Sequence, residues 1–232
     1  MTLHSPLRQA VFAALLAFLI VAACAKGRPP AGDIRQVARS SQPDQQLEPF
    51  EMLDPAAAGH VRGREDAPVR VIEFSDFGCP YCARFALEIY PALHREYVET
   101  GKVQWRYVTI VMGRYPNGAE AARAAECAAE QGEDAFWAVH DLLYARQPEW
   151  TEAGEPEALF GRYVADAGLD TGRFESCYRE NRSRPRVMAG IALAAQSAVR
   201  GAPTFFINGV RVEGVLPVER FRRVLDEVAA AQ

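Results

Sequence analysis

One short stretch constrains the fold of this 232-residue chain more than any other. Residues 69–82 have the sequence Val-Arg-Val-Ile-Glu-Phe-Ser-Asp-Phe-Gly-Cys-Pro-Tyr-Cys. The largely apolar, β-branched residues 69–74 predict a buried strand, and residues 75–78 predict a short turn. Pro80 favours the first position of a following helix, because its missing N–H is not needed there and its φ is already helical. The stretch therefore predicts a strand, a turn and a helix that begins at Cys79.

The two cysteines at the start of this helix are suitably spaced for thiol–disulfide exchange. Cys79 is expected at the N-cap, where unpaired backbone N–H groups and the positive end of the helix dipole favour its thiolate. Cys82, three residues later, is expected on the same helix face and close enough to close a disulfide. We therefore expect Cys79 to be an exposed, activated nucleophile and Cys82 to be the resolving thiol beneath it.

Two motifs far apart in the sequence carry a family resemblance. The first is Glu-Phe-Ser-Asp-Phe-Gly-Cys-Pro-Tyr-Cys at residues 73–82, and the second is Gly-Ala-Pro-Thr-Phe-Phe-Ile-Asn-Gly at residues 201–209. Together they resemble the DsbA-like thiol–disulfide oxidoreductases, and the resemblance extends from about Asp66 to the C-terminus. It implies an α/β chain with a thioredoxin-like fold and an all-helical insertion between the βαβ half and the C-terminal ββα half.

The order of the predicted elements agrees with this fold. The βαβ half is expected to contain a leading strand at 57–61, a helix at 79–99 that Pro91 kinks, and a strand at 103–111. The insertion is expected to contain helices at 119–130, 135–146, 156–167, 173–181 and 183–199. The ββα half is expected to contain strands at 204–207 and 210–215, joined by an Asn208-Gly209 turn, and a helix after Pro217. We assign 57–115 and 200–232 to the thioredoxin-like domain and 116–199 to the inserted helical domain.

The N-terminal residues predict export. An apolar run at 10–23 has the length of a signal-peptide core and is too short for a comfortable membrane span. It ends in Val-Ala-Ala-Cys24, which resembles a bacterial lipobox. Residues 1–24 are therefore expected to be a signal peptide with Cys24 as the lipidation site; an ordinary cleaved signal and an uncleaved anchor are the alternatives. Residues 25–56 contain Pro, Gly, Gln and Ser with few large apolar residues, and they predict a flexible linker.

The resemblance gives catalytic roles to two residues near the cysteines. It implies a cis peptide bond before Pro203, which would lie against the active-site disulfide and shape the substrate groove; a trans proline that starts an edge strand is the alternative. It also places an acidic residue at Glu73, beneath Cys82. Burial there would raise the carboxyl pKa toward neutrality and suit Glu73 to proton transfer. The alternative is a strand-end carboxylate that faces solvent.

Three further residues are expected to tune the redox potential. Pro80 and Tyr81 lie between the two cysteines. The strongest oxidases of the family carry histidine at the position of Tyr81, and tyrosine adds no positive charge there, so a milder oxidant is expected. Ala202 replaces the threonine or valine common in relatives and removes a hydroxyl from the site, which leaves substrate preference and potential open.

The remaining cysteines suggest a second, structural disulfide. Matching cysteines pair in several relatives, so the resemblance implies a Cys127–Cys177 bond that closes a loop of about 50 residues. Two buried free thiols are the alternative. A zinc site built on Cys79 and Cys82 would need two more ligands at suitable spacing, and Cys127 and Cys177 lie on separate predicted helices. No metal and no organic cofactor is expected.

The formal net charge of −4 and the absence of a Lys/Arg cluster disfavour a nucleic-acid partner. We expect an exported protein disulfide oxidase in the periplasm or cell envelope, anchored to the membrane by an N-terminal lipid. Its substrates would be unfolded, cysteine-containing envelope proteins, and a quinone-linked membrane partner would reoxidise it. Residues 25–58 are too short and polar for a dimerisation domain, which favours a monomer. A disulfide reductase or isomerase, and a non-catalytic thioredoxin-fold binding protein, are the alternatives.

Overall fold

The computed structural model describes residues 58–231. The expected signal peptide at 1–24, the lipidation site Cys24 and the linker at 25–56 lie outside the described residues. No helix within 58–231 has both the length and the apolar character needed to cross a bilayer.

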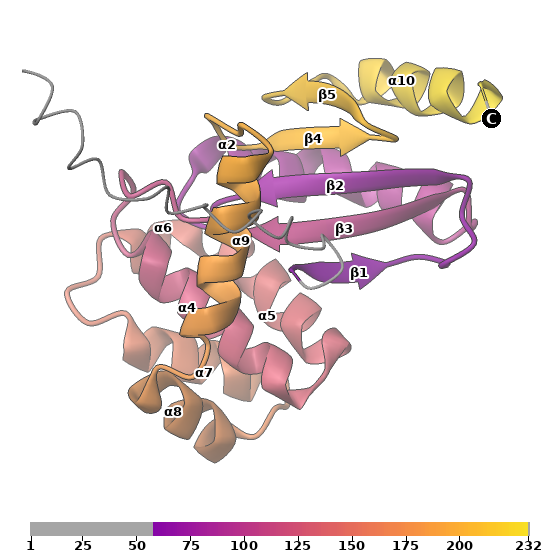
Figure 1. Cartoon of the computed structure of the whole chain (residues 1–232). Coiled ribbons are helices and arrows are strands. Elements are labelled where there is room, and N and C mark those ends of the chain that lie inside the picture. Colours follow the sequence, from indigo (N-terminus) through magenta and orange to yellow (C-terminus); the bar gives the residue numbers. More distant parts are fainter. Residues whose placement is uncertain (1–57, 232) are drawn as a thin grey trace, which may run out of the picture. The chain divides into compact units, whose positions relative to one another are not determined.

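A mixed five-stranded sheet in the order β1-β3-β2-β4-β5 forms the centre of the described part (Figure 1). Its strands are β1 (His60–Arg62), β2 (Val69–Ser75), β3 (Val103–Thr109), β4 (Thr204–Ile207) and β5 (Val210–Glu213). β2 and β3 are parallel, whereas the β1–β3, β2–β4 and β4–β5 pairs are antiparallel. A βαβ half and a ββα half therefore share one sheet, and the predicted thioredoxin-like α/β fold is confirmed.

Strand β2 runs in the middle of the sheet and extends one residue further than expected, to Ser75. Successive side chains of a strand point to opposite faces. Val69 and Val71 therefore pack in the main core, while Ile72 and Phe74 pack in a second cluster on the other face. By the same alternation, Glu73 and Ser75 share the face of Val69 and Val71, which is the face toward the helix that carries the two cysteines.

That helix is one continuous run of helical residues with two widened turns. It consists of α2 (Pro80–Arg84), η2 (Phe85–Ile89), α3 (Tyr90–Leu93) and η3 (His94–Val98). In the widened turn η2, the N–H of Tyr90 bonds to the carbonyl of Phe85. Pro91 follows directly, and a proline has no N–H and crowds the carbonyl four residues earlier. The irregularity expected at Pro91 thus takes the form of a wide π turn just before it.

Six α-helices and one short 3₁₀ turn lie between β3 and β4. They are α4 (Gly118–Ala128), η4 (Ala129–Gln131), α5 (Glu133–Ala145), α6 (Gln147–Thr151), α7 (Glu157–Asp166), α8 (Thr171–Glu180) and α9 (Arg184–Gln196). Helices α4, α5, α7 and α8 form one group beside the sheet, and α9 crosses in front of β2 and β3 (Figure 1). Five of these helices correspond to the predicted ones. α6 was not predicted, because five residues are too few to show a periodic apolar pattern.

Helices cover both faces of the sheet. On one face, Leu193 of α9 packs with Phe74 in a cluster of buried apolar residues. Gly190 allows this close approach, since a Cβ there would lie 2.1 Å from the carbonyl oxygen of Thr109. On the other face lie the cysteine-bearing helix and α10 (Val218–Ala230).

The expected hairpin turn is also present: Asn208 and Gly209 have φ values of 44° and 86°, as a type I′ turn requires.

Candidate active site

The turn between β2 and α2 is built by the buried side chain of Asp76. Its Oδ1 accepts the N–H of Gly78 at 2.8 Å, and its Oδ2 accepts the N–H of Met112 at 2.7 Å. The N–H of Cys79 in turn donates to the carbonyl of Asp76 at 3.0 Å. Cys79 then occupies the N-cap of α2 with extended backbone, and Pro80 follows in the first turn. Asp76 therefore fixes where the helix begins and where the first sulfur lies.

Cys79 is buried, so the expectation that it is exposed is wrong. Its side chain is 0% exposed, and its thiol donates to the carbonyl of Ala202 at 3.4 Å. The half-buried Tyr115 also hydrogen-bonds to the sulfur. This loop packs so closely that a Cβ on Gly78 would lie 2.5 Å from the Cβ of Tyr115. The two segments that cover Cys79 are distant from it in the sequence, so its burial could not be predicted from the local sequence.

The surroundings of Cys79 favour its thiolate. The hydrogen bond from Cys82 lowers the pKa of Cys79 most, burial opposes this, and the Tyr115 hydroxyl and the backbone N–H groups of Cys82 and Tyr81 lower it further. The result is a pKa of about 6, against an ordinary value of 9.0. At pH 7 such a group is about nine-tenths thiolate, whereas an ordinary cysteine is about one-hundredth. Cys79 is therefore the activated sulfur of the pair.

Cys82 has the opposite electrostatic surroundings. It is 0% exposed, and burial followed by the neighbouring Cys79 raises its pKa well above 9.0. The hydroxyl of Ser75 and the backbone N–H of Asp76 oppose this only in part. Both cysteines are free thiols in this structure. Cys82 thus holds its proton while Cys79 releases its own.

Glu73 is buried on β2 and does not face solvent as in the alternative considered above. Its side chain is 3% exposed. Ser75 donates its hydroxyl to Oε1 at 2.7 Å, and the indole N–H of Trp105 donates to Oε2 at 2.9 Å. Burial raises the pKa of Glu73 to about 7, although both hydrogen bonds act in the opposite direction. The carboxyl can therefore gain or lose a proton near neutral pH.

Three of the remaining expected residues border the cysteines. The Ala202–Pro203 peptide bond is cis, and it brings the carbonyl of Ala202 to the sulfur of Cys79. The N–H of Gly214 donates to the carbonyl of Pro203 at 2.8 Å, which ties this loop to the end of β5. Tyr81 is 60% exposed next to Cys79, so its ring is available to an incoming polypeptide.

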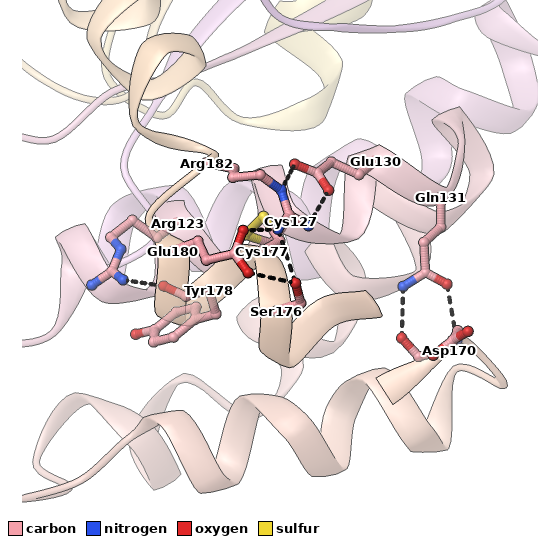
Figure 2. The surroundings of a disulfide bond; sticks show 10 residues. All are labelled: Arg123, Cys127, Glu130, Gln131, Asp170, Ser176, Cys177, Tyr178, Glu180 and Arg182. Carbon is pink, nitrogen blue, oxygen red and sulfur yellow. Dashed lines mark hydrogen bonds and ion pairs between the residues drawn. A yellow bond between two sulfur atoms is a disulfide. The ribbon is translucent and has the colours of Figure 1, made fainter. Parts of the chain in front are cut away.

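Cys127 and Cys177 form the disulfide that the resemblance implied, and it joins α4 to α8. Both residues are at most 1% exposed. Polar contacts cross the same interface: Figure 2 shows Arg182 paired with Glu130, and Gln131 exchanging hydrogen bonds with the backbone of Asp170. The disulfide belongs to a closed, cross-linked region of the insertion, where it stabilises the docking of two helices.

Three residues of the site were not predicted from the sequence. Ser75 follows Glu73 by two positions, so the strand alternation alone places both on one face. Trp105 reaches Glu73 because it pairs with Val71 in the β2–β3 register, which the sequence does not specify. Tyr115 gave no sequence signal. Within residues 58–231, no group of three or more His, Cys, Asp or Glu side chains is arranged to hold a metal ion.

The chain is similar to several known proteins. A family model described as Thioredoxin matches residues 56–227. A Bacillus anthracis protein named probable disulfide bond formation protein D is 32% identical over 149 residues, which cover 63% of this chain and 68% of that protein. The Na(+)/H(+) antiporter NhaA 3 of Salinispora tropica is 40% identical over 162 residues, which cover 69% of this chain. The chain spans only 23% of the length of that antiporter.

Among solved structures, oxidised BdbD from Bacillus subtilis has a TM-score of 0.70 at 22% identity, and the match covers 77% of this chain and 96% of BdbD. This likeness shows a shared fold. The family model and the Bacillus anthracis relative add the family, and the range matched by the family model includes the two cysteines at the start of α2. The chain therefore belongs to the thioredoxin family and, within it, to the DsbA-like thiol–disulfide oxidoreductases.

Proposed function

We propose that this protein is an exported disulfide oxidase that introduces disulfides into unfolded, cysteine-containing envelope proteins. Cys79 is the nucleophile, Cys82 is the resolving cysteine, Glu73 holds the transferred proton, and Pro203 shapes the substrate groove. The opposed pKa shifts of Cys79 and Cys82 carry this proposal. A sulfur that is stable as a thiolate is a good leaving group, and a neighbour that stays protonated does not compete with it.

The reaction balances as two exchanges. A thiolate of the client attacks Cys79 in the oxidised protein, which forms a mixed disulfide and releases Cys82, and Cys82 then takes up a proton. A second client thiolate attacks the client sulfur of that mixed disulfide, and Cys79 leaves as a thiolate. Two electrons pass from the client to the protein, and the client gains one disulfide. The same steps in reverse describe reduction of a client.

The pKa of Cys79 sets the expected oxidising strength. At pH 7, the Cys79 pKa of about 6 shifts the equilibrium between oxidised and reduced protein about tenfold toward the reduced form, compared with a thiol of ordinary pKa. For a two-electron couple, a factor of ten corresponds to about 30 mV. This supports a mild oxidant, which agrees with the exposed, uncharged Tyr81 between the cysteines. Pro80 and Ala202 are the other residues that we propose to tune the potential.

Two refolding reactions test the direction of electron flow. Oxidised protein is mixed with a reduced, unfolded substrate that regains activity when its disulfides form. Reduced protein is mixed with the same substrate carrying scrambled disulfides. We expect faster recovery in the first reaction; faster recovery in the second supports the reductase or isomerase. Insulin reduction by wild type and by Cys79→Ala tests the binding-protein alternative, because equal activity would show that the cysteines are incidental.

We also propose the domain organisation, location and partners that follow from the sequence. Residues 57–115 and 200–232 form the thioredoxin-like domain, and 116–199 form the inserted domain. The buried Cys127–Cys177 bond supports export, since disulfides persist mainly in oxidising compartments. A lipid on Cys24 would hold a monomer at the periplasmic membrane, near a quinone-linked partner that reoxidises it. The intact mass of membrane-extracted protein tests the anchor: a chain that lacks residues 1–23 and carries no acyl mass contradicts it.

A further inference from the structure

Cys82 must gain or lose a proton in every turnover, yet its side chain is not in contact with bulk solvent. Its side chain is 0% exposed. The carboxyl of Glu73, which we propose as the proton store, is 3% exposed. A transfer that needs no entry of solvent would pass between protein groups that are already in contact.

The hydroxyl of Ser75 is the group that touches both partners. Ser75 is 0% exposed and donates to Glu73 Oε1 at 2.7 Å. The same hydroxyl is close enough to the sulfur of Cys82 to lower the pKa of that thiol, and it also acts on the hydroxyl of Tyr144. The other hydrogen bond to the Glu73 carboxylate comes from Trp105, whose indole N–H does not exchange protons in such a step. Ser75 thus lies between the acid and the thiol.

A hydroxyl has one hydrogen to donate and two lone pairs that accept, so it can carry a proton in either direction without becoming charged. With Glu73 ionised, Cys82 donates its S–H to Ser75 while Ser75 donates to Glu73. With Glu73 protonated, Glu73 donates to Ser75 while Ser75 donates to the Cys82 thiolate. The two arrangements differ by two short proton shifts, and the heavy atoms keep their places.

We propose that Ser75 is the proton-transfer residue between Cys82 and Glu73. The proposal rests on the oxidoreductase function above. In the oxidising direction, the client thiolate attacks Cys79, the Cys79–Cys82 bond breaks, and the leaving Cys82 takes the Ser75 proton as Ser75 takes the Glu73 proton. In the reducing direction, Cys82 loses its proton through Ser75 to Glu73 and attacks Cys79 in the mixed disulfide. The released partner leaves as a thiolate.

The resolving step isolates this transfer. Reduced protein reacts with oxidised glutathione, so that Cys79 first forms a mixed disulfide and Cys82 then displaces glutathione. Rapid acid quench and intact mass give both rates as a function of pH. Cys79 has no free thiol in the mixed disulfide, so it does not titrate in the second step. The other titratable groups that face Glu73 or Cys82 are Asp76, Tyr90, Tyr107, Tyr115 and Tyr144.

The four tyrosines keep their protons near pH 7. Burial raises the pKa values of Tyr90, Tyr107, Tyr115 and Tyr144 above their ordinary value of 10.0, to about 12 for Tyr115. Burial also raises the pKa of Asp76, and hydrogen bonds from the N–H groups of Met112 and Gly78 oppose this. We assign an inflection near pH 7 in the resolving rate to Glu73, whose pKa is about 7, and the loss of the inflection in Glu73→Gln tests this assignment.

We expect Ser75→Ala to slow the resolving step at least tenfold and to remove this inflection, while formation of the mixed disulfide by Cys79 keeps its wild-type rate. Glu73→Gln should have the same two effects. The double variant should resolve the mixed disulfide only slightly more slowly than either single variant, because both residues act in one relay. Tyr163→Phe is the control away from the site: it removes a hydroxyl that donates to Glu149 at 2.9 Å, and it should keep the wild-type rate and inflection.

A folded Ser75→Ala variant that keeps the inflection and a resolving rate within twofold of wild type would overturn the proposal, as would additive losses in the double variant. If Ser75→Ala does not fold, the wild-type resolving rate is measured in mixtures of H₂O and D₂O. A curved dependence on the deuterium fraction indicates two protons in motion and supports the relay, and a linear one contradicts it. Client refolding is measured separately, so failure of the oxidase proposal is distinguishable from failure of the relay.

Discussion

Replacement of Glu73 by glutamine should stabilise this protein, and it should do so only at neutral and alkaline pH. The buried carboxyl has a pKa of about 7 in the folded protein against 4.5 in the unfolded chain. The folded state thus holds more protons than the unfolded state between these values, so the free energy of unfolding falls as the pH rises through this window. Above pH 7 the cost of the buried charge is fully present.

The size of the effect follows from the two pKa values. The cost of Glu73 at pH 8 exceeds its cost at pH 5 by about 2.5 kcal/mol. Glutamine carries no charge, its carbonyl can accept the Trp105 N–H, and its amide can donate to the Ser75 oxygen, so the variant escapes this cost. For a domain of this size the advantage corresponds to about 5–10 °C in melting temperature.

Denaturant unfolding of both proteins, measured between pH 5 and pH 8 under reducing conditions, tests this prediction. The difference between the two curves cancels the titration of Cys79, which both proteins share. We expect the free energy of unfolding of Glu73→Gln, relative to that of wild type, to rise steadily from pH 5 to pH 8. A difference that is constant with pH would show that Glu73 titrates normally in the folded protein, and it would refute the assignment of this carboxyl as a proton store at neutral pH.

Three further predictions concern the rest of the site and the insertion. Alkylation of Cys79 in the reduced protein should be half-maximal near pH 6, and a midpoint near pH 9 would contradict its activation. Joint Cys127→Ala and Cys177→Ala substitution should lower the free energy of unfolding by about 4 kcal/mol through loop-closure entropy and leave exchange at Cys79 intact; loss of exchange in the folded variant would show a redox role. Gly78→Ala should displace Tyr115, since the new Cβ would lie 2.5 Å from the Tyr115 Cβ, and it should raise the alkylation midpoint; an unchanged midpoint would argue against the tyrosine as a thiolate donor.

Features set by local chemistry could be predicted from the sequence. The Asn208-Gly209 pair requires positive φ at both positions, and the turn has it. Pro80 and the apolar residues of β2 fixed where the strand ends and the helix begins, to within one residue. The spacing of Cys79 and Cys82 on one turn of helix was enough to assign unequal chemistry to the two thiols.

Features that depend on packing between distant segments could not be predicted. The burial of Cys79 depends on Ala202 and Tyr115, and neither contact has a local signal. Trp105 reaches Glu73 through the register of two strands, which is decided by the whole sheet. Ser75 is an intermediate case: the alternation of β2 predicts its face, but its contact with Cys82 becomes evident only when the helix is docked.

The reduction potential of the Cys79–Cys82 pair decides whether this protein oxidises or reduces its clients. The protein is equilibrated in glutathione buffers of known ratio, and the reduced fraction is read from the mass added by a thiol label. We predict a potential between the ≈ −270 mV of thioredoxin and the ≈ −120 mV of DsbA, because the Cys79 thiolate is stabilised but the exposed residue between the cysteines is the uncharged Tyr81. A potential at or below that of thioredoxin would contradict the account, since the protein would then reduce its clients.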